Sequence, residues 1–289
     1  MYKLIAIDLD GTLLNSYGEI TNKNREAIKY AIDKGVEVIL ASGRNVQTME
    51  KMSIELGINN FLVAGNGACI YDIQNKKNIY ESYIEKQKAL KIIKVCKENS
   101  IFFNIYTNEG IITESLNYNV KVFNNENNYR PNNKRTNIEI VDNIETYIGN
   151  NNFKILKIII CDESKIIFNN IIEKLKNIKG VDVLDIEHMS RKIIRVGTEE
   201  HKVEYFYTEV TNQSTNKWRT LEFLGERLNI KKEEMICIGD NINDLEMVKN
   251  AGIGIVMKNS ALEKQNIADY ITEDNNSDGV ANAIYKYVK

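Results

Sequence analysis

Two carboxylates lie two residues apart near the start of the chain, in the segment Asp8-Leu9-Asp10-Gly11-Thr12. The segment follows a short apolar run, and an extended backbone there would let both side chains reach one site. Two carboxylates held together repel each other, and a bound cation relieves that repulsion. Mg²⁺ prefers oxygen ligands and is commonly held by one or two carboxylates together with a substrate phosphate. The segment therefore predicts a Mg²⁺ site.

Three further polar segments also come directly after predicted strands. In open α/β sheets, ligands bind outside the carboxyl ends of the strands. We therefore expect all four segments to meet at one edge of a sheet, although they are far apart in the sequence. The three segments are Ala41-Ser42-Gly43-Arg44, Gly65-Asn66-Gly67-Ala68 and Gly239-Asp240-Asn241-Ile242-Asn243-Asp244.

These segments also have the donors that an anion needs. Ser42 and Gly43 offer a hydroxyl and backbone N–H groups at the start of a predicted helix. Asp240 and Asp244 add carboxylates on the opposite side of the expected site. A phosphoryl group also requires a positive charge, and Lys217, at the start of another predicted helix, is the best candidate.

Each segment taken alone has a simpler interpretation. SGR and GNGA also occur as ordinary turns, GDNIND as a polar helix cap, and an isolated lysine is usually solvated. A calcium loop is a further alternative, but Leu13 stands where such a loop requires glycine, and the preceding run is strand-like rather than helical. The near match to the spacing of that loop involves Asp8, Asp10, Thr12, Ser16 and Glu19.

The elements that must position these residues alternate between apolar strands and helices at both ends of the chain. Strands are predicted over 2–7, 36–40, 61–64, 235–238 and 252–256, and helices over 22–34, 46–56, 217–228 and 243–249. Thr21 is a suitable N-cap for the first helix. Continuous apolar strands separated by helices indicate a parallel sheet covered on both faces, and hence a Rossmann-like, three-layer α/β core.

The middle of the chain has a different pattern. Strands are predicted over 101–106, 110–113, 154–160 and 181–186, with helices over 86–98 and 165–177 between them. Their alternating character suggests a sheet with one packed and one solvated face. We therefore expect a core formed by residues 1–81 and 210–289, with an α+β domain inserted over 82–209.

The composition excludes several classes of function. The chain has 289 residues, a formal net charge of −2, 43% hydrophobic and 27% charged residues. It predicts neither a basic surface for nucleic acid nor a membrane-spanning or signal segment. Four cysteines without a CxxC pair predict neither a zinc site nor a disulfide framework, and suggest a reducing, cytoplasmic location. A small solute is the expected partner.

Taken in order, the DLDGT segment, Ser42-Gly43-Arg44, Lys217 and the GDNIND segment resemble the four motifs of the haloacid dehalogenase superfamily. The insertion point after the third strand, the Asn66-Gly67-Ala68 turn and the size of the insert are similar to the Cof-type subfamily, which carries a large α+β cap of the C2B type. One difference is Trp218, which follows the motif lysine where family members usually have glycine. The resemblance implies a cap that sets substrate specificity.

The resemblance implies a Mg²⁺-dependent phosphatase that hydrolyses small phosphorylated metabolites, with sugar phosphates expected. Asp8 would be the nucleophile that forms an aspartyl phosphate, and also a metal ligand. Asp10 would be the general acid and base, and its backbone carbonyl would bind the metal. Asp240 would be the second carboxylate ligand, with Asp244 supporting the metal from the outer shell.

The phosphoryl group would be held by five residues, and two more are expected to touch the leaving group. A phosphomutase and a non-catalytic, phosphate-binding regulatory protein remain alternatives on the same scaffold, and the expected oligomeric state is a monomer or a weak homodimer. The phosphoryl-binding residues are Leu9, Ser42, Gly43, Lys217 and Asn243, and the leaving-group residues are Arg44 and Asn66.

Overall fold

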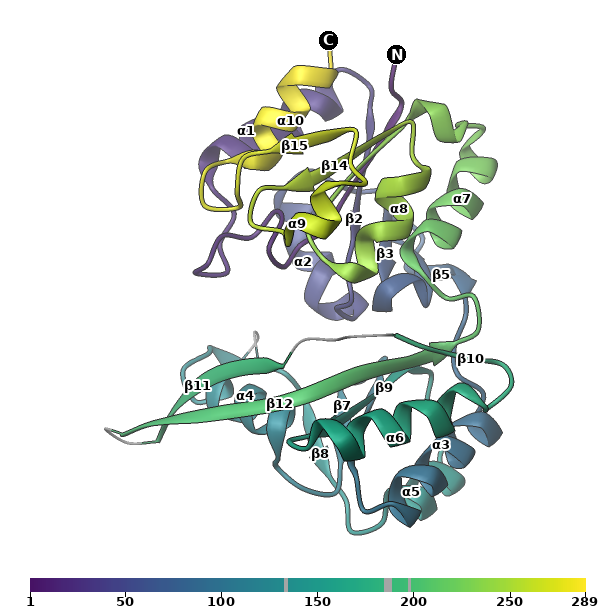
Figure 1. The fold of residues 1–289 in the computed structure, drawn as a ribbon. Coiled ribbons are helices and arrows are strands. Elements are labelled where there is room, and N and C mark those ends of the chain that lie inside the picture. The colour runs from purple at the N-terminus through teal and green to yellow at the C-terminus, as the bar shows by residue number, and fades with distance from the viewer. Residues whose placement is uncertain (133–134, 185–188, 197–198) are drawn as a thin grey trace. The chain divides into compact units, whose positions relative to one another are not determined.

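The computed structural model describes residues 1–132, 135–184, 189–196 and 199–289 (Figure 1). The chain forms two compact units, one made of Met1–Glu81 with Thr215–Lys289 and the other of Ser82–Ser214. The second unit ends five residues beyond the expected boundary at 209. The reason is that β12 (Glu199–Asn212) runs through this boundary and pairs with β10 (Val181–Val183) up to its last residue.

An eight-stranded sheet forms the centre of the first unit, in the order β15-β14-β13-β1-β2-β3-β4-β5. Six neighbouring strands are parallel, including all five that the sequence predicts for this unit. Two further strands at one edge are antiparallel, so the complete sheet is mixed. The parallel strands are β1 (Leu4–Ile7), β2 (Glu37–Ala41), β3 (Phe61–Ala64), β13 (Met235–Gly239), β14 (Ile253–Met257) and β15 (Tyr270–Thr272), and the antiparallel ones are β4 (Cys69–Asp72) and β5 (Lys77–Glu81).

Helices cover both faces of this sheet, which gives the three-layer α/β core expected from the sequence (Figure 1). They are α1 (Asn22–Asp33), α2 (Val46–Glu55), α7 (Lys217–Leu228), α8 (Leu245–Asn250), α9 (Leu262–Gln265) and α10 (Gly279–Tyr287). The Thr21 side chain accepts a hydrogen bond from the Asn24 backbone at the start of α1, which confirms the predicted N-cap. Leu4 and Ala6 pack with α7, and by alternation Ile5 and Ile7 face the opposite layer.

The second unit is a sheet with helices packed on it, in the strand order β10-β12-β9-β6-β7-β8, and β11 pairs with β12. One face holds a continuous apolar core that includes Ile105, Ile158 and Ile160 from the strands and Ile92 and Ile171 from the helices. The remaining elements are β6 (Phe102–Thr107), β7 (Ile111–Thr113), β8 (Ile138–Ile140), β9 (Ile155–Asp162), β11 (Ser190–Val196), α3 (Lys86–Glu98), α4 (Tyr118–Asn127), α5 (Ile144–Asn150) and α6 (Lys165–Lys176).

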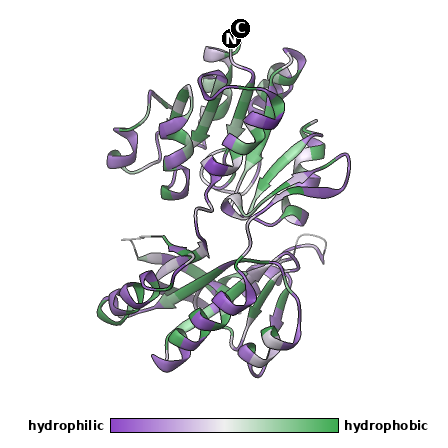
Figure 2. Cartoon of the chain, turned by 90° about the vertical axis from the view of Figure 1, so that its right-hand side faces the viewer, coloured by the Kyte–Doolittle hydropathy of each residue, from purple (hydrophilic) through white to green (hydrophobic). Residues whose placement is uncertain are grey.

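The hydropathy of both units follows this layering. Figure 2 shows hydrophobic strands flanked by helices whose outer sides are hydrophilic. All four cysteines are buried and none forms a disulfide. Among the described residues, no helix combines the length and the apolar character that crossing a bilayer requires. The predicted strand over 181–186 is shorter in the structure, where β10 ends at Val183, and residues 185 and 186 lie outside the described part of the chain.

Candidate active site

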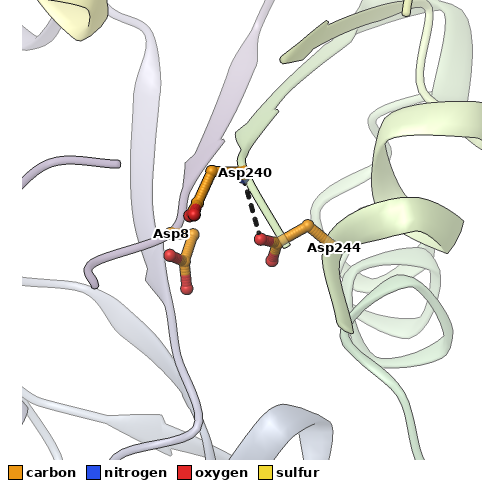
Figure 3. A group of neighbouring side chains, drawn as sticks. All are labelled: Asp8, Asp240 and Asp244. Atoms are coloured by element: carbon orange, nitrogen blue, oxygen red, sulfur yellow. Dashed lines mark hydrogen bonds between the residues drawn. The ribbon is translucent and has the colours of Figure 1, made fainter. Parts of the chain in front are cut away.

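Three aspartates from distant parts of the sequence meet at the carboxyl edge of the first unit's sheet. Asp8 follows β1, Asp240 follows β13, and Asp244 ends the short 3₁₀ helix η4 (Ile242–Asp244) (Figure 3). Each offers a carboxylate oxygen, and these oxygens all lie within 4.8 Å of one another. The meeting follows from the topology, because β1 and β13 are parallel neighbours with Ile7 opposite Ile238.

Lys217, the first residue of α7, supplies the positive charge beside this group. Its Nζ donates to Asp8 Oδ1 at 2.5 Å and to Asp244 Oδ1 at 2.6 Å, and its side chain is 0% exposed. The Asn216 side chain caps α7 by accepting from the Arg219 backbone, which fixes the helix start. Trp218 lies in the apolar core of the unit, so its bulk does not exclude Lys217 from the site.

Asp244 braces the acidic group through both of its carboxylate oxygens. Oδ1 accepts from Lys217, and Oδ2 accepts the backbone N–H groups of Asp240 at 3.1 Å and Asn241 at 3.0 Å. Asp240 is held from the other side by Thr12, whose hydroxyl donates to Oδ1 at 2.8 Å. The geometry therefore gives Asp8 and Asp240 the best placement for direct ligation of a cation, with Asp244 as their support.

The electrostatics of the group favour a bound cation. Burial, followed by the charge of Asp244, raises the pKa of Asp8 well above its ordinary value, although Lys217 opposes this. Burial and Asp244 also raise the pKa of Asp240 to about 6. Burial alone would lower the pKa of Lys217, but Asp244 and Asp8 raise it above its ordinary value, so the lysine stays charged. When all three carboxyl groups are ionised, the single ammonium of Lys217 leaves excess negative charge that a cation would offset, and their oxygens suit Mg²⁺.

The Asp10 carboxylate is not among the three that lie within 4.8 Å of one another, so the structure does not hold it directly against the Asp8 carboxylate. The Asp10 side chain is 60% exposed and pairs with Arg44, whose Nε donates to Oδ2 at 2.8 Å and Nη2 to Oδ1 at 2.6 Å. The chain turns after β1, with the Leu9 carbonyl accepting from the Thr12 and Leu14 backbones, so the two aspartates do not continue one extended strand. Arg44 binds Asp10 here rather than standing free for a leaving group.

Gly11 allows the first and last motif segments to approach closely. Its φ of +87° lies in the left-handed region, and a Cβ at this position would lie 2.4 Å from Asp240 Oδ2. A larger residue would therefore displace the Asp240 carboxylate.

Three of the five residues expected to hold a phosphoryl group, Ser42, Gly43 and Asn243, form a second cluster at the same edge. Ser42 is buried, and its hydroxyl accepts from the Arg44 backbone at 3.3 Å. Asn243 belongs to η4, and its Nδ2 donates to Asn66 Oδ1 at 2.9 Å. Gly43 packs directly against the Asn66 side chain. The structure thus brings these residues together.

Two residues of the site were missed by sequence reasoning. Asn259 Nδ2 donates to the Gly11 carbonyl at 2.9 Å, and Ser260 Oγ donates to the Asp240 carbonyl at 2.8 Å. Both follow β14, just as the other polar segments follow their strands. Their position directly after a strand could have identified them, but Asn and Ser are also common in ordinary turns, so the signal is weaker than for aspartates.

A family model for haloacid dehalogenase-like hydrolases matches residues 5–284, which is nearly the whole chain. The chain belongs to this family. The site described above therefore lies in a haloacid dehalogenase-like hydrolase, as the order of the four motifs predicts.

Relatives of this hydrolase align over almost their full length. The 5-amino-6-(5-phospho-D-ribitylamino)uracil phosphatase YcsE of Bacillus subtilis is 29% identical, covering 99% of this chain and 96% of its own. Phosphatase YwpJ of the same organism is also 29% identical, covering 96% and 97%. A crystal structure of a haloacid dehalogenase-like hydrolase from Bacteroides thetaiotaomicron is 27% identical and superposes with a TM-score of 0.77 over 99% of both chains.

Proposed function

We propose that this hydrolase is a Mg²⁺-dependent phosphatase that removes phosphate from small phosphorylated metabolites, sugar or polyol phosphates among them, through a phosphorylated Asp8. The observation that carries the proposal is the buried carboxylate of Asp8, hydrogen-bonded to Lys217 and facing Asp240 at the sheet edge. The phosphatase names of the aligned relatives support the reaction class.

Asp8 and Asp240 would hold the Mg²⁺ ion. Their oxygens are hard donors, and burial and the charge of Asp244 raise the pKa values of both. The oxygens of Asp244 are already engaged by Lys217 and the backbone. When bound, the ion would offset negative charge on the phosphoryl oxygens.

Lys217 has the geometry to bind the phosphoryl group as well as Asp8. An ammonium carries three N–H donors, and Asp8 and Asp244 take two of them. The third can donate to a phosphoryl oxygen. In the proposed reaction an Asp8 carboxylate oxygen attacks phosphorus, and the bond from phosphorus to the leaving oxygen breaks. Fixed positive charge at this point is the main contribution that a protein makes to phosphoryl transfer.

Asp10 would supply the proton for the leaving oxygen. Its exposed carboxylate is reachable by a substrate, and in this role it exchanges Arg44 for the leaving group. In the second half-reaction the Asp10 carboxylate accepts a proton from water as the water oxygen attacks phosphorus. This step releases inorganic phosphate and restores Asp8, so two displacements replace one.

Phosphate release from p-nitrophenyl phosphate, and then from a panel of sugar and polyol phosphates, tests the proposal. We expect turnover with Mg²⁺. Removing the metal with a chelator should lower the rate by about 100-fold or more, because the metal lowers the activation barrier by several kcal/mol. Restoration by added Mg²⁺ is the control for damage by the chelator. Absence of turnover on the whole panel would contradict the phosphatase, and equal rates without metal would contradict the metal dependence.

The affinity for Mg²⁺ should fall as the pH is lowered through about 6. The pKa of Asp240 is raised to about 6 by burial and by Asp244, so below that pH a proton occupies the carboxylate that the metal needs. The dissociation constant should rise roughly tenfold per pH unit for each proton displaced. Calorimetric titration with Mg²⁺ at pH 5, 6 and 7, repeated in buffers of different ionisation enthalpy, measures both the constant and the proton release. An affinity that stays constant from pH 7 to pH 5 would contradict the assignment of Asp240 as a ligand.

A further inference from the structure

The turn Gly65–Gly67 (η1) contacts three other parts of the site: the segment that follows β2, the η4 segment and the start of α7. Asn66 at its centre has φ 57° and ψ 33°, which is the left-handed region, and only 7% of the residue is exposed. Its backbone N–H donates to the Ser42 carbonyl at 3.0 Å, and the N–H of Gly65 donates to the Arg44 carbonyl at 2.9 Å. The turn is therefore bound to the segment that follows β2.

The Asn66 side chain reaches two further parts of the site. Its Oδ1 accepts from Asn243 Nδ2 at 2.9 Å. A Cβ on Gly43 would lie 2.9 Å from Oδ1 and 3.1 Å from Nδ2, so the amide packs on the Gly43 backbone with no room for a side chain between them. One amide thus joins residues that follow β2 and β13.

The next residue joins the turn to the helix that carries Lys217. The Gly67 carbonyl accepts from Thr220 Oγ1 at 2.9 Å. Gly67 has φ +96°, and a Cβ there would lie 2.3 Å from the Asn216 carbonyl oxygen. The first turn of α7 therefore contacts the same short segment.

From these contacts we infer that Asn66 is a positioning residue, which orients Asn243 and the Ser42-Gly43 backbone for the phosphoryl group rather than touching the leaving group. This inference rests on the proposed phosphatase site. An amide has two N–H donors, and Asn243 uses one on Asn66, which fixes the direction of the other. The expectation that Asn66 contacts the leaving group does not fit its burial or its engaged Oδ1.

Asn66→Gly removes the side-chain amide but keeps the backbone turn, because glycine adopts a left-handed conformation readily. We expect kcat/KM for p-nitrophenyl phosphate to fall about 10- to 100-fold, as is typical when the partner of a binding group is removed. We expect the dissociation constant of inorganic phosphate, measured by calorimetry with Mg²⁺, to rise about tenfold, with the Mg²⁺ affinity changed less than about twofold. Asn229→Gly is the matched control, since Asn229 is an exposed, left-handed asparagine at the end of α7.

A double-mutant cycle decides whether Asn66 acts through Asn243. If it does, Asn66→Gly combined with Asn243→Ala should bind phosphate no more weakly than Asn243→Ala alone, within about twofold. Losses that multiply would overturn the inference, and so would wild-type phosphate affinity in Asn66→Gly.

Gly43→Ala keeps the inference testable if Asn66→Gly does not fold. The added methyl group would push the Asn66 amide away from Asn243, although neither asparagine is substituted. We expect phosphate binding to weaken several-fold, and unchanged binding would overturn the inference. Phosphate binding is measured without turnover, so a wild-type protein that binds phosphate but hydrolyses no phosphate ester would contradict the proposed function and leave this test intact.

Discussion

Asp8→Asn should abolish turnover while the protein remains folded. An amide cannot attack phosphorus, and loss of an enzyme's nucleophile lowers kcat by on the order of 10⁴- to 10⁶-fold. Phosphate release from p-nitrophenyl phosphate at saturating Mg²⁺ measures the effect. Asp33→Asn is the matched control, because Asp33 is exposed at the end of α1 and the same substitution there should leave the rate unchanged. Turnover by Asp8→Asn at the wild-type rate would end the covalent mechanism.

The direction in which Asp8→Asn changes the stability of the fold can also be predicted. In the metal-free protein, burial and Asp244 raise the pKa of Asp8 well above its ordinary value, so the folded state prefers the protonated carboxyl. This preference stabilises the fold at low pH and is lost as the pH rises through the raised pKa. A neutral amide avoids that loss. Above this pKa and without Mg²⁺, thermal unfolding of Asp8→Asn should therefore occur at or above the wild-type midpoint, and a large decrease would contradict the electrostatic account.

The strand ends of the core could be predicted because buried parallel strands have a simple sequence pattern. β1 and β13 are continuous apolar runs, and Asp8 and Asp240 are the first acidic residues after them. The helix that presents Lys217 could be located from its amphipathic pattern. Local sequence therefore identified the residues of the acidic group, although their contacts are made across the whole first unit.

The partner of Asp10 could not be predicted from local sequence. Where its carboxylate points depends on the turn after Leu9 and on Arg44, which comes from the end of the neighbouring strand β2. In the same way, the bracing role of Asp244 depends on backbone N–H groups that turn toward it only in the folded loop. Such contacts are set by tertiary packing, which spacing along the chain does not reveal.

Two strands that the sequence analysis did not predict share another physical feature. β11 and the first part of β12 form a largely exposed two-stranded ribbon, with ion pairs such as Arg191 to Glu204 and Arg195 to Glu200 across it. A strand exposed in this way needs few apolar residues, so its sequence resembles that of a polar loop. Neither of the two histidines has a partner at metal-ligand spacing in the sequence; His201 lies in this exposed ribbon, and His188 lies outside the described residues.

Lys217→Met should lower both the activity and the stability of the protein. The substitution leaves Asp8 and Asp244 buried and facing each other without their shared ammonium. Removing one member of a buried ion pair costs about 3–5 kcal/mol of unfolding free energy, because the remaining charge is uncompensated. The loss of a fixed charge at the phosphoryl group should lower kcat by about 10²- to 10³-fold.

The pH dependence separates this electrostatic effect from a simple packing defect. Without Lys217, which opposes the rise, the pKa of Asp8 should be raised further, so acidification protonates Asp8 and removes its repulsion with Asp244. The stability gap to the wild type, measured by urea unfolding without Mg²⁺, should therefore be larger at pH 8 than at pH 5.5. Lys3→Met is the matched control, because it removes a surface ion pair with Glu234 in the same unit and should change stability much less than Lys217→Met at either pH. A gap that is equal at both pH values would show that Lys217 contributes by packing alone, since the apolar volume of methionine does not depend on pH.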